Sequence, residues 1–286
     1  MKNFLFILII TVLMSSCEDP VDIEISNGVA QLSVDAFVNN LPTEQTIYLK
    51  MTKNFFETDS QAPVIGASVK IVDSKGAVYH FTDVDNIGKY SWGDSVLIHE
   101  GLTYDLEINY NDEMYTSTEL ANPVPAIDSL VISPLDSRFG EENNEEEFQI
   151  ELFAIDIAGR TDHYWIKLFR NDSIDTRSDA INVSLNGANG PGADGVLFIP
   201  PIRFFPLNDF RRPYLSGESV RVEIHSINKN AYFFFLQVVN QINNSGLFAV
   251  PLSNVKTNIE SSSSETAKKA VGIFSVSMVS VEGKDI

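Results

Sequence analysis

The chain has 286 residues, 44% of them hydrophobic, and it carries 39 acidic against 20 basic side chains for a net charge of −19. This length suffices for one large domain or two of ordinary size, and the composition is that of a globular protein. The negative charge argues against DNA, RNA or an anionic lipid surface as a partner, because those ligands are bound through basic patches.

The first residues have the organisation of an export signal. Lys2 supplies a positive charge, residues 4–14 are apolar apart from one threonine, and two serines follow. A membrane-spanning helix needs about 20 apolar residues, so this run is too short for a permanent span. We predict that residues 1–16 are a cleaved signal peptide and that residues 17–30 form a tether with little core.

The end of this signal resembles the lipobox of bacterial lipoproteins. It reads LMSSC and ends at Cys17, which is the only cysteine and therefore has no disulfide partner within the chain. The resemblance implies cleavage before Cys17, a diacylglycerol thioether on its sulfur and an acyl chain on its new amino group. One acyl chain gives only marginal attachment, at about 0.8 kcal/mol per buried methylene, whereas three hold a domain firmly at a membrane. The alternative is an ordinary cleaved signal in which Cys17 merely lies at the junction.

Two acidic residues, Glu18 and Asp19, follow the cysteine directly. In lipoproteins of Bacteroidota, acids at these positions resemble a signal for transport to the outer leaflet of the outer membrane. The alternative is a solvated linker that is acidic because the whole chain is acidic. We expect a lipid-anchored protein on the outer membrane that faces the cell surface.

Period-two alternation of apolar and polar residues, the signature of half-buried strands, fills residues 31–122. The clearest case is YDLEINY at residues 104–110, which a turn joins to residues 114–120 as a hairpin. Further strands are predicted at 31–38, 46–51 and 67–71, and no helical period competes. We predict an N-terminal β-sandwich over residues 31–122.

Pro123 and Pro125 mark the predicted domain boundary, because alternating prolines block both helix and central strand. A C-terminal β-rich domain is predicted over residues 123–286. Its predicted strands are residues 127–132, 148–154, 164–169, 220–225 and 274–278, and residues 182–195, rich in Asn and Gly, are predicted to be a long loop. Alternation continues after Met278 on a shifted register, which indicates a bulge.

One helix is predicted near the C-terminal end, over residues 229–244. Asn228 or Asn230 can cap it, Gly246 can close it, and residues 231–242 are apolar nearly all round. Such a helix is usually buried, so we expect it to pack on the second sheet, with docking of a partner as the alternative. The predicted fold is mainly all-β, with two sandwich-like domains and one buried helix.

Several stretches taken together resemble one group of Bacteroidota outer-membrane lipoproteins, the domain of unknown function 4249 family. These are residues 16–19 (SCED), 32–36 (LSVDA), 63–69 (PVIGASV), 225–232 (HSINKNAY), 258–259 (NI) and 271–274 (VGIF). Members are often encoded beside TonB-dependent outer-membrane receptors, and no catalytic residues are assigned for them. The resemblance implies an accessory subunit rather than an enzyme.

A second resemblance lies within the first half. Residues 66–71 (GASVKI) followed by residues 83–90 (DVDNIGKY) are similar to carboxypeptidase-regulatory-like sandwich domains. The Asp, Asn and Gly residues between them are typical of a turn. A calcium loop is the minor alternative, because Ile87 stands where the fifth position needs an oxygen ligand.

No pattern nominates a catalytic, metal or cofactor site. His80, His99, His163 and His225 show no ligand spacing, and no Gly-x-Ser-x-Gly elbow exists. The glycine-rich residues 187–195 lack the lysine of a phosphate-binding loop. We therefore expect no enzyme activity, no cofactor and no resident metal.

Aromatic side chains are the remaining candidates for binding. They are Trp92, Trp165, Phe204 and Phe205, which could stack sugars or anchor a protein partner if exposed. Trp165 shares its strand face with Lys167, opposite the expected core. Ordinary packing is the alternative for all four.

These observations lead to two functional expectations. The first is a surface-exposed, non-enzymatic accessory or binding subunit of a TonB-dependent transport system, held at the membrane by its lipid anchor and partnered by the receptor. The second is a stand-alone surface lipoprotein that binds a glycan or peptide.

Overall fold

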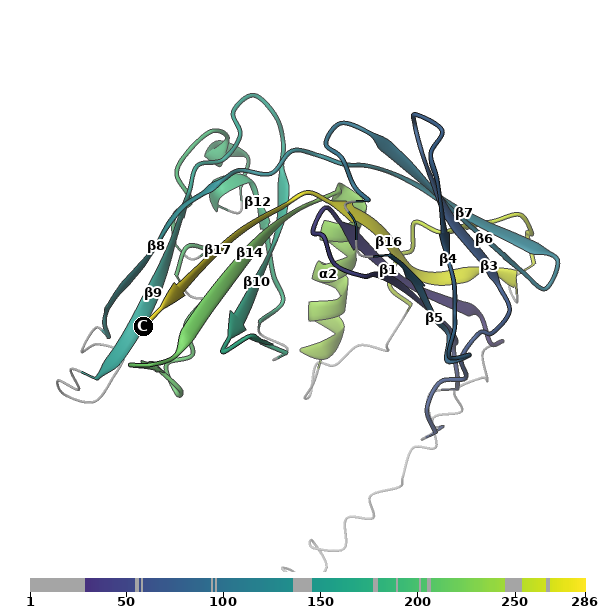
Figure 1. Ribbon diagram of the computed structural model, residues 1–286, viewed down its shortest axis with the longest axis horizontal. Coiled ribbons are helices and arrows are strands. Elements are labelled where there is room, and N and C mark those ends of the chain that lie inside the picture. The colour runs from purple at the N-terminus through teal and green to yellow at the C-terminus, as the bar shows by residue number, and fades with distance from the viewer. Residues whose placement is uncertain are drawn as a thin grey trace, which may run out of the picture.

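Two β-sandwiches lie side by side with one α-helix between them (Figure 1). The structure is a computed structural model that describes residues 29–54, 57, 59–93, 95, 97–135, 146–176, 180–188, 190–200, 202–204, 207–244, 254–265 and 268–286. The predicted signal peptide, Cys17, Glu18, Asp19, Phe205 and Gly246 lie outside the described residues. The mainly all-β fold predicted from alternation is confirmed.

The first sandwich pairs a four-stranded sheet with a five-stranded one. The four-stranded sheet has the order β16 (Ala270–Ser277), β1 (Leu32–Asn39), β2 (Gln45–Met51) and β5 (Lys89–Trp92). The five-stranded sheet has the order β15 (Glu260–Ser261), β7 (Glu113–Leu120), β6 (Thr103–Tyr110), β3 (Ser68–Asp73) and β4 (Val78–Phe81). Between them lies a core to which alternate residues of each strand contribute, such as Val34, Ile71 and Leu106.

The second sandwich has the same two-layer construction. One sheet has the order β11 (Ser173–Ile174), β10 (His163–Arg170), β14 (Ser219–Ile227) and β17 (Val279–Asp285), with β12 (Asn182–Leu185) also paired to β10. The other has the order β13 (Tyr214–Leu215), β9 (Glu147–Ala154) and β8 (Ile127–Pro134). Its core is separate from the first and includes Leu152, Ile166 and Val222, each burial contributing about 1.5–3 kcal/mol.

The chain passes between the sandwiches three times. Strands β1–β7 build the first sandwich, β8–β14 the second, β15 and β16 return to the first, and β17 ends in the second. The sheets therefore do not follow the predicted division into residues 31–122 and 123–286, because β15 and β16 pair with strands of the first segment. Alternation shows that a segment is a strand, but not which sheet it joins.

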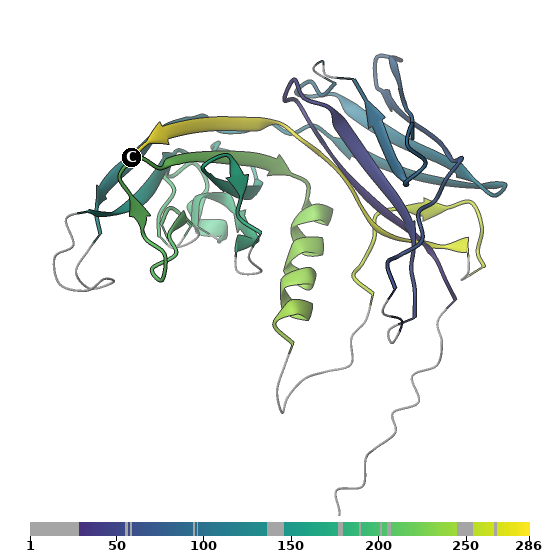
Figure 2. The ribbon, with the colours of Figure 1, turned by 60° about the horizontal axis from the view of Figure 1, so that its bottom comes forward.

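The shifted register after Met278 is a crossing rather than the predicted bulge. β16 runs parallel to β1 up to Ser277, and β17 pairs antiparallel with β14 from Val279 onward. Figure 2 shows the two strands as one long arch, in yellow, that spans both sandwiches. The alternation shifts at Met278 because the chain leaves one sheet and joins the edge of another, where Val279 is buried and Val281 is 40% exposed.

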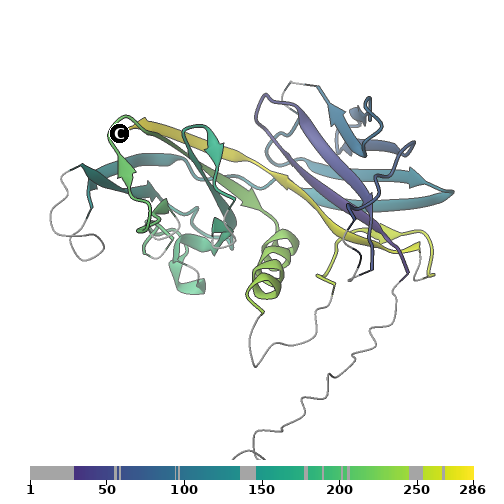
Figure 3. The same ribbon diagram turned by 90° about the horizontal axis from the view of Figure 1, so that it is seen from below.

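The predicted helix is confirmed as α2 (Lys229–Ile242), which begins directly after β14. It is less buried than its composition predicts, since only Ala231 and Phe235 are fully buried and Phe233 is 45% exposed. It packs on both sandwiches, against Val183 of β12 and Ile273 of β16, and lies between them in Figure 3. No helix in the described ranges is long and apolar enough to cross a membrane.

Part of the segment predicted as a long loop is ordered secondary structure. Residues Asn182–Leu185 form β12, and two short 3₁₀ turns, Asn186–Ala188 and Pro191–Ala193, follow. Asn182 and Ser184 are buried although they are polar, so both faces of this strand are covered. The alternating run is only four residues long and continues into Asn- and Gly-rich residues, which is why the sequence favoured a loop here.

Side chains tie the three crossings together in what we name the crossing network. Ser226 Oγ donates to the carbonyl of Asn122 at 2.7 Å and accepts from the Met278 amide at 3.2 Å. Asn122 Nδ2 donates to Asn228 Oδ1 at 2.6 Å, and Asn228 Nδ2 donates to the Leu120 carbonyl. Asn228 is the residue before α2, but its side chain is used here instead of capping the helix.

A second part of the crossing network surrounds Glu119, which is buried in β7. Its Oε1 accepts hydrogen bonds from Asn258 Nδ2 at 2.7 Å and from Asn230 Nδ2 at 3.3 Å. Asn258 also bonds the amide and the carbonyl of Phe274 in β16. Burial raises the pKa of Glu119, and the two amide donors offset only part of this effect.

Replacing Gly272 with alanine should lower the free energy of unfolding by about 3 kcal/mol or more. Gly272 has a φ of +97°, and an added Cβ would overlap the carbonyl oxygen of Val34 in β1. Gly76→Ala is the matched control, because Gly76 has a φ of +90° but open space around it, so only a conformational cost of about 1–2 kcal/mol applies. Urea unfolding measures both; equal losses would contradict a role for the close approach of β16 to β1.

Candidate functional site between the sandwiches

The four predicted binding aromatics have different environments. Trp165 lies on the outer face of β10, between the sandwiches. Trp92 packs edge-on against Tyr79, with ring centroids 5.2 Å apart, and Phe204 is buried with 8% exposure. Phe205 lies outside the described residues. The structure thus singles out Trp165, and we name its surroundings the Trp165 site: Asp35, Phe37, Trp165, Lys167, Glu223 and His225.

At this site the outer faces of two sheets meet. Phe37 projects from β1 of the first sandwich and lies 5.4 Å from Trp165, and Phe235 of α2 lies 4.6 Å from Trp165 and 5.4 Å from Phe37, all measured between ring centroids. Two residues further along the same faces come Asp35 on β1 and Lys167 on β10. The aromatic contact therefore brings an acid and a base to opposite sides of the junction.

Lys167 is a half-buried cation without a carboxylate partner. Its Nζ lies 4.0 Å from the centroid of the Trp165 ring, which is a cation–π contact. Within the described part of the chain its ammonium makes no hydrogen bond or ion pair within 4.0 Å. Burial lowers its pKa, and the nearby charges of Glu223 and Asp35 offset only part of this effect.

Asp35 lies on the exposed side of β1. Desolvation by the surrounding protein raises its pKa, and the positive charges of Lys50 and Lys167 lower the pKa by a smaller amount. Among the residues that the structure describes, its carboxylate has no hydrogen-bond or ion-pair partner. Tyr48, 41% exposed, is paired with it on the same sheet face. Asp35 and Lys167 thus attract each other without touching.

Behind these two charges lies a closed ion network. Glu223 accepts a hydrogen bond from Arg221 and one from His225 Nε2 at 2.9 Å, and His225 Nδ1 lies 3.1 Å from Ser277 Oγ. A carboxylate only accepts, so the His225 proton lies on Nε2 and Nδ1 accepts from Ser277. Burial alone would raise the pKa of Glu223, but His225 and the charges of Lys167 and Arg221 lower it.

A cavity of about 220 Å³ opens beside Trp165 and Lys167. Its walls are mainly apolar and come from β10, from the segment after it and from the last residue of α2. They include Trp165, Leu168, Ile174, Ile181 and Ile242, with Lys167, Asp175 and Thr176 as the polar members. Ile174 and Ile242 are 46% and 48% exposed, so apolar surface meets solvent at this cavity.

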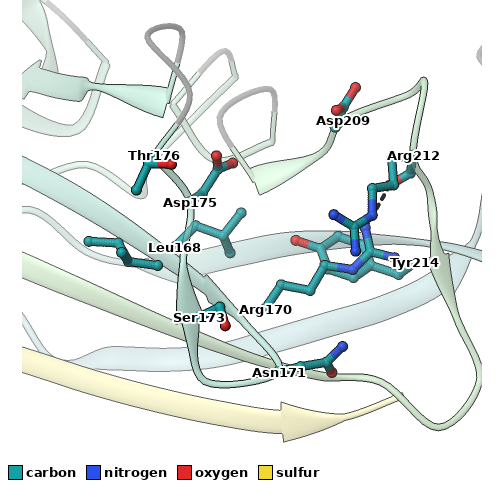
Figure 4. Close-up of a pocket in the computed structure, with 10 residues that line it drawn as sticks. Leu168, Arg170, Asn171, Ser173, Asp175, Thr176, Asp209, Arg212 and Tyr214 are labelled. Carbon is teal, nitrogen blue, oxygen red and sulfur yellow. Dashed lines mark hydrogen bonds between the residues drawn. The ribbon is translucent and has the colours of Figure 1, made fainter.

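A second hollow of about 420 Å³, shown in Figure 4, lies around Arg170, Arg212 and Tyr214. The guanidinium of Arg170, at the centre of this hollow, already has hydrogen-bond partners within the protein. Arg170 makes two bonds to Glu218, donates to the carbonyls of Arg212 and Pro213, and lies over the Tyr214 ring. Because its guanidinium holds the segment around Arg212 and Pro213 in place, Arg170 has a structural role. This hollow is therefore a weaker candidate for ligand binding than the Trp165 site.

The turn at residues 83–90, considered above as a calcium loop, is stabilised by hydrogen bonds from its own backbone amides. The Asp83 carboxylate accepts from the amides of Ile87 and Gly88 at 3.1 and 2.8 Å. In the described part of the chain, no three His, Cys, Asp or Glu side chains gather in a metal-binding group.

Comparison with protein families gives one result. The family model for the domain of unknown function DUF4249 matches residues 18–282, nearly the whole chain. The protein belongs to the DUF4249 family. No curated protein matches it significantly.

In this DUF4249 protein three of the motifs that carry the family resemblance, at residues 225–232, 258–259 and 271–274, lie at the junction between the sandwiches. Ser226, Asn228, Asn230 and Asn258 belong to the crossing network, and Gly272 permits the close pairing of β16 with β1. These three motifs therefore help to fix the fold at the junction.

Sequence analysis placed Trp165 and Lys167 on one outer face, but it did not identify Asp35, Phe37 or Phe235 as their neighbours. One signal was present in the sequence. Phe37 is a large apolar residue at a position where alternation in β1 places polar side chains, which indicates contact with something outside the first core.

His225 should make the folded state less stable as the pH falls from about 6.5 to about 4. Burial, aided by the charge of Lys167, lowers its pKa from 6.5 to about 4. In this window the unfolded chain binds a proton that the folded chain does not, so stability is complete above the window and is lost within it, by on the order of 3 kcal/mol.

His225→Gln keeps a donor for Glu223 and should flatten this part of the stability profile, measured by urea unfolding at several pH values. The exposed His99 provides the control variant, His99→Gln, which should keep the slope. An unchanged slope for His225→Gln would show that another group controls the acid response.

Proposed function

We propose that this DUF4249 protein is a lipid-anchored, non-enzymatic binding subunit on the outer face of an outer membrane, acting with a TonB-dependent receptor. The proposed anchor is Cys17, and Glu18 and Asp19 are the proposed signal for surface transport. The observation that carries the binding role is the Trp165 site, where Lys167 lines an open apolar cavity and Asp35 lies on the facing strand, both without an ion-pair partner among the residues that the structure describes.

The geometry of the Trp165 site supports binding rather than chemistry. Two titratable groups are buried there: the Glu223 carboxylate accepts from Arg221 and His225, and His225, 2% exposed, has both ring nitrogens occupied, by Glu223 and Ser277. A general base must reach the proton that it removes, within about 2.6–3.2 Å or through one water. Lys167 and Asp35 can therefore attract and orient a ligand, while His225 supports the site from behind.

Two rigid sandwiches suit a docking subunit because the binding surface is fixed in advance. Three chain crossings and the crossing network hold β1 and β10 in one relative position. A preformed surface loses less conformational entropy on binding than a mobile one. The alternative, a stand-alone peptide-binding lipoprotein, is favoured by the same cavity but requires affinity in the absence of a receptor.

Replacing Cys17 with alanine should release the protein from the membrane, because the acyl chains have no other attachment point. Fractionation of cells followed by immunoblotting measures this, and Ser16→Ala serves as the control that keeps the cysteine. Membrane association of the Cys17→Ala variant after a high-salt wash would contradict the anchor.

Affinity purification of the tagged protein from mildly detergent-solubilised outer membranes should recover a TonB-dependent receptor, identified by mass spectrometry. An untagged strain controls for nonspecific recovery. Recovery of no receptor, with the bait intact and abundant, would contradict the accessory role and favour the stand-alone alternative. Protease added to intact cells should also remove the protein, and full protection would contradict its surface position.

A further inference from the structure

We infer that the Trp165 site binds a short peptide with free ends, placing its carboxylate against Lys167, its ammonium against Asp35 and an apolar side chain in the cavity. This inference rests on the proposed binding function and names its ligand class. Three features of the molecule support it: the charges of Lys167 and Asp35, the size and lining of the cavity, and the charge of the whole protein.

The first feature is a pair of solvent-accessible charges that have no ion-pair partner among the described residues. Lys167 has three N–H donors, and within the described residues no oxygen accepts from them, although the ammonium lies over the Trp165 ring. In the same described part of the chain, no group donates to the Asp35 carboxylate. Because the aromatic contact of Phe37 with Trp165 sets the spacing of β1 and β10, Asp35 and Lys167 are held beyond ion-pair distance. A ligand that carries both charges can satisfy both groups with charge-assisted hydrogen bonds.

The second feature is the cavity. At about 220 Å³ it is smaller than the roughly 300–1,000 Å³ of pockets for drug-sized ligands, so it accepts one apolar group rather than a whole molecule. Its walls include Leu168, Ile181 and Ile242, which match an aliphatic side chain. The rest of the ligand would lie outside the cavity, along Lys167 toward Asp35.

The third feature is charge. The chain carries a net charge of −19, and Asp175, which has an interaction partner of its own, also lines the cavity. A purely anionic ligand such as a fatty acid would be repelled by this field, whereas a zwitterion has no net charge.

A glycan fits the Trp165 site less well than a peptide. Stacking on a sugar requires an open ring face, but the ring of Trp165 is surrounded by Lys167, Phe37, Phe235 and His225. The apolar cavity and the two opposite charges have no counterpart in a neutral sugar.

Isothermal titration calorimetry on the detergent-purified full chain tests this inference with four probes: trileucine, trileucine amide, N-acetyltrileucine and triserine. Trileucine should bind at least roughly tenfold more tightly than each of the other three, a difference of about 1.4 kcal/mol. The amide removes the charge that Lys167 would bind, the acetyl group removes the charge that Asp35 would bind, and triserine removes the apolar side chains.

Two variants assign the contacts. Lys167→Met keeps an aliphatic chain over Trp165 and should abolish the preference for trileucine over its amide. Asp35→Asn should abolish the preference for the free over the acetylated amine. These ratios are measured within one variant, so a general loss of stability does not mimic them. Lys75→Met and Asp85→Asn, at exposed positions of the first sandwich away from the site, should keep both preferences.

Absence of measurable trileucine binding would overturn this inference, and so would ratios that stay unchanged in Lys167→Met and Asp35→Asn. Neither result would contradict the proposed function, which is judged by recovery of a receptor without any peptide. Lys167→Met should still recover the receptor, which separates ligand binding from docking.

Discussion

The parallel pairing of β1 with β16 is the constraint on which the rest of this structure depends. β1 and β16 are distant in sequence, yet they match in register over eight residue pairs, from Leu32–Ala270 to Asn39–Ser277. Because β16 continues through Met278 into β17, this pairing also fixes the second sandwich relative to the first. Gly272 makes the pairing feasible, since a side chain there would overlap the backbone of Val34.

Hydrogen bonds from polar side chains stabilise the junction, whereas apolar packing stabilises each sandwich. Three crossings bring backbone groups together where no continuous ladder can pair them, and buried backbone groups left unpaired cost about 1–3 kcal/mol each. The side chains of Ser226, Asn228 and Asn258 supply the missing partners. Ser226, Asn228 and Asn258 all belong to motifs that carry the family resemblance, so these motifs help to join the two sandwiches.

The Trp165 site follows from the same junction. The crossings bring the outer faces of β1 and β10 together, and α2 fills only part of the space between them with Phe235 and Ala231. What remains includes the cavity lined by Trp165, Lys167 and Ile242, and Asp35 lies on the outer face of β1, opposite β10. A binding surface thus arises where two sandwiches meet, a common position for ligand sites in proteins built of several packed units.

Local residue patterns alone determined much of this protein. Alternation located the longer strands of both sandwiches, such as β1, β6 and β10, and the apolar run after Asn228 located α2. Both are possible because side-chain direction in a strand or helix depends only on neighbours along the chain. The outward face shared by Trp165 and Lys167 was determined in the same way. Only the tertiary structure decided that β15 and β16 return to the first sandwich, that Met278 is a crossing, and that Asp35 faces Lys167. Those features depend on which distant segments pair, and the period of a strand is the same whichever sheet it joins.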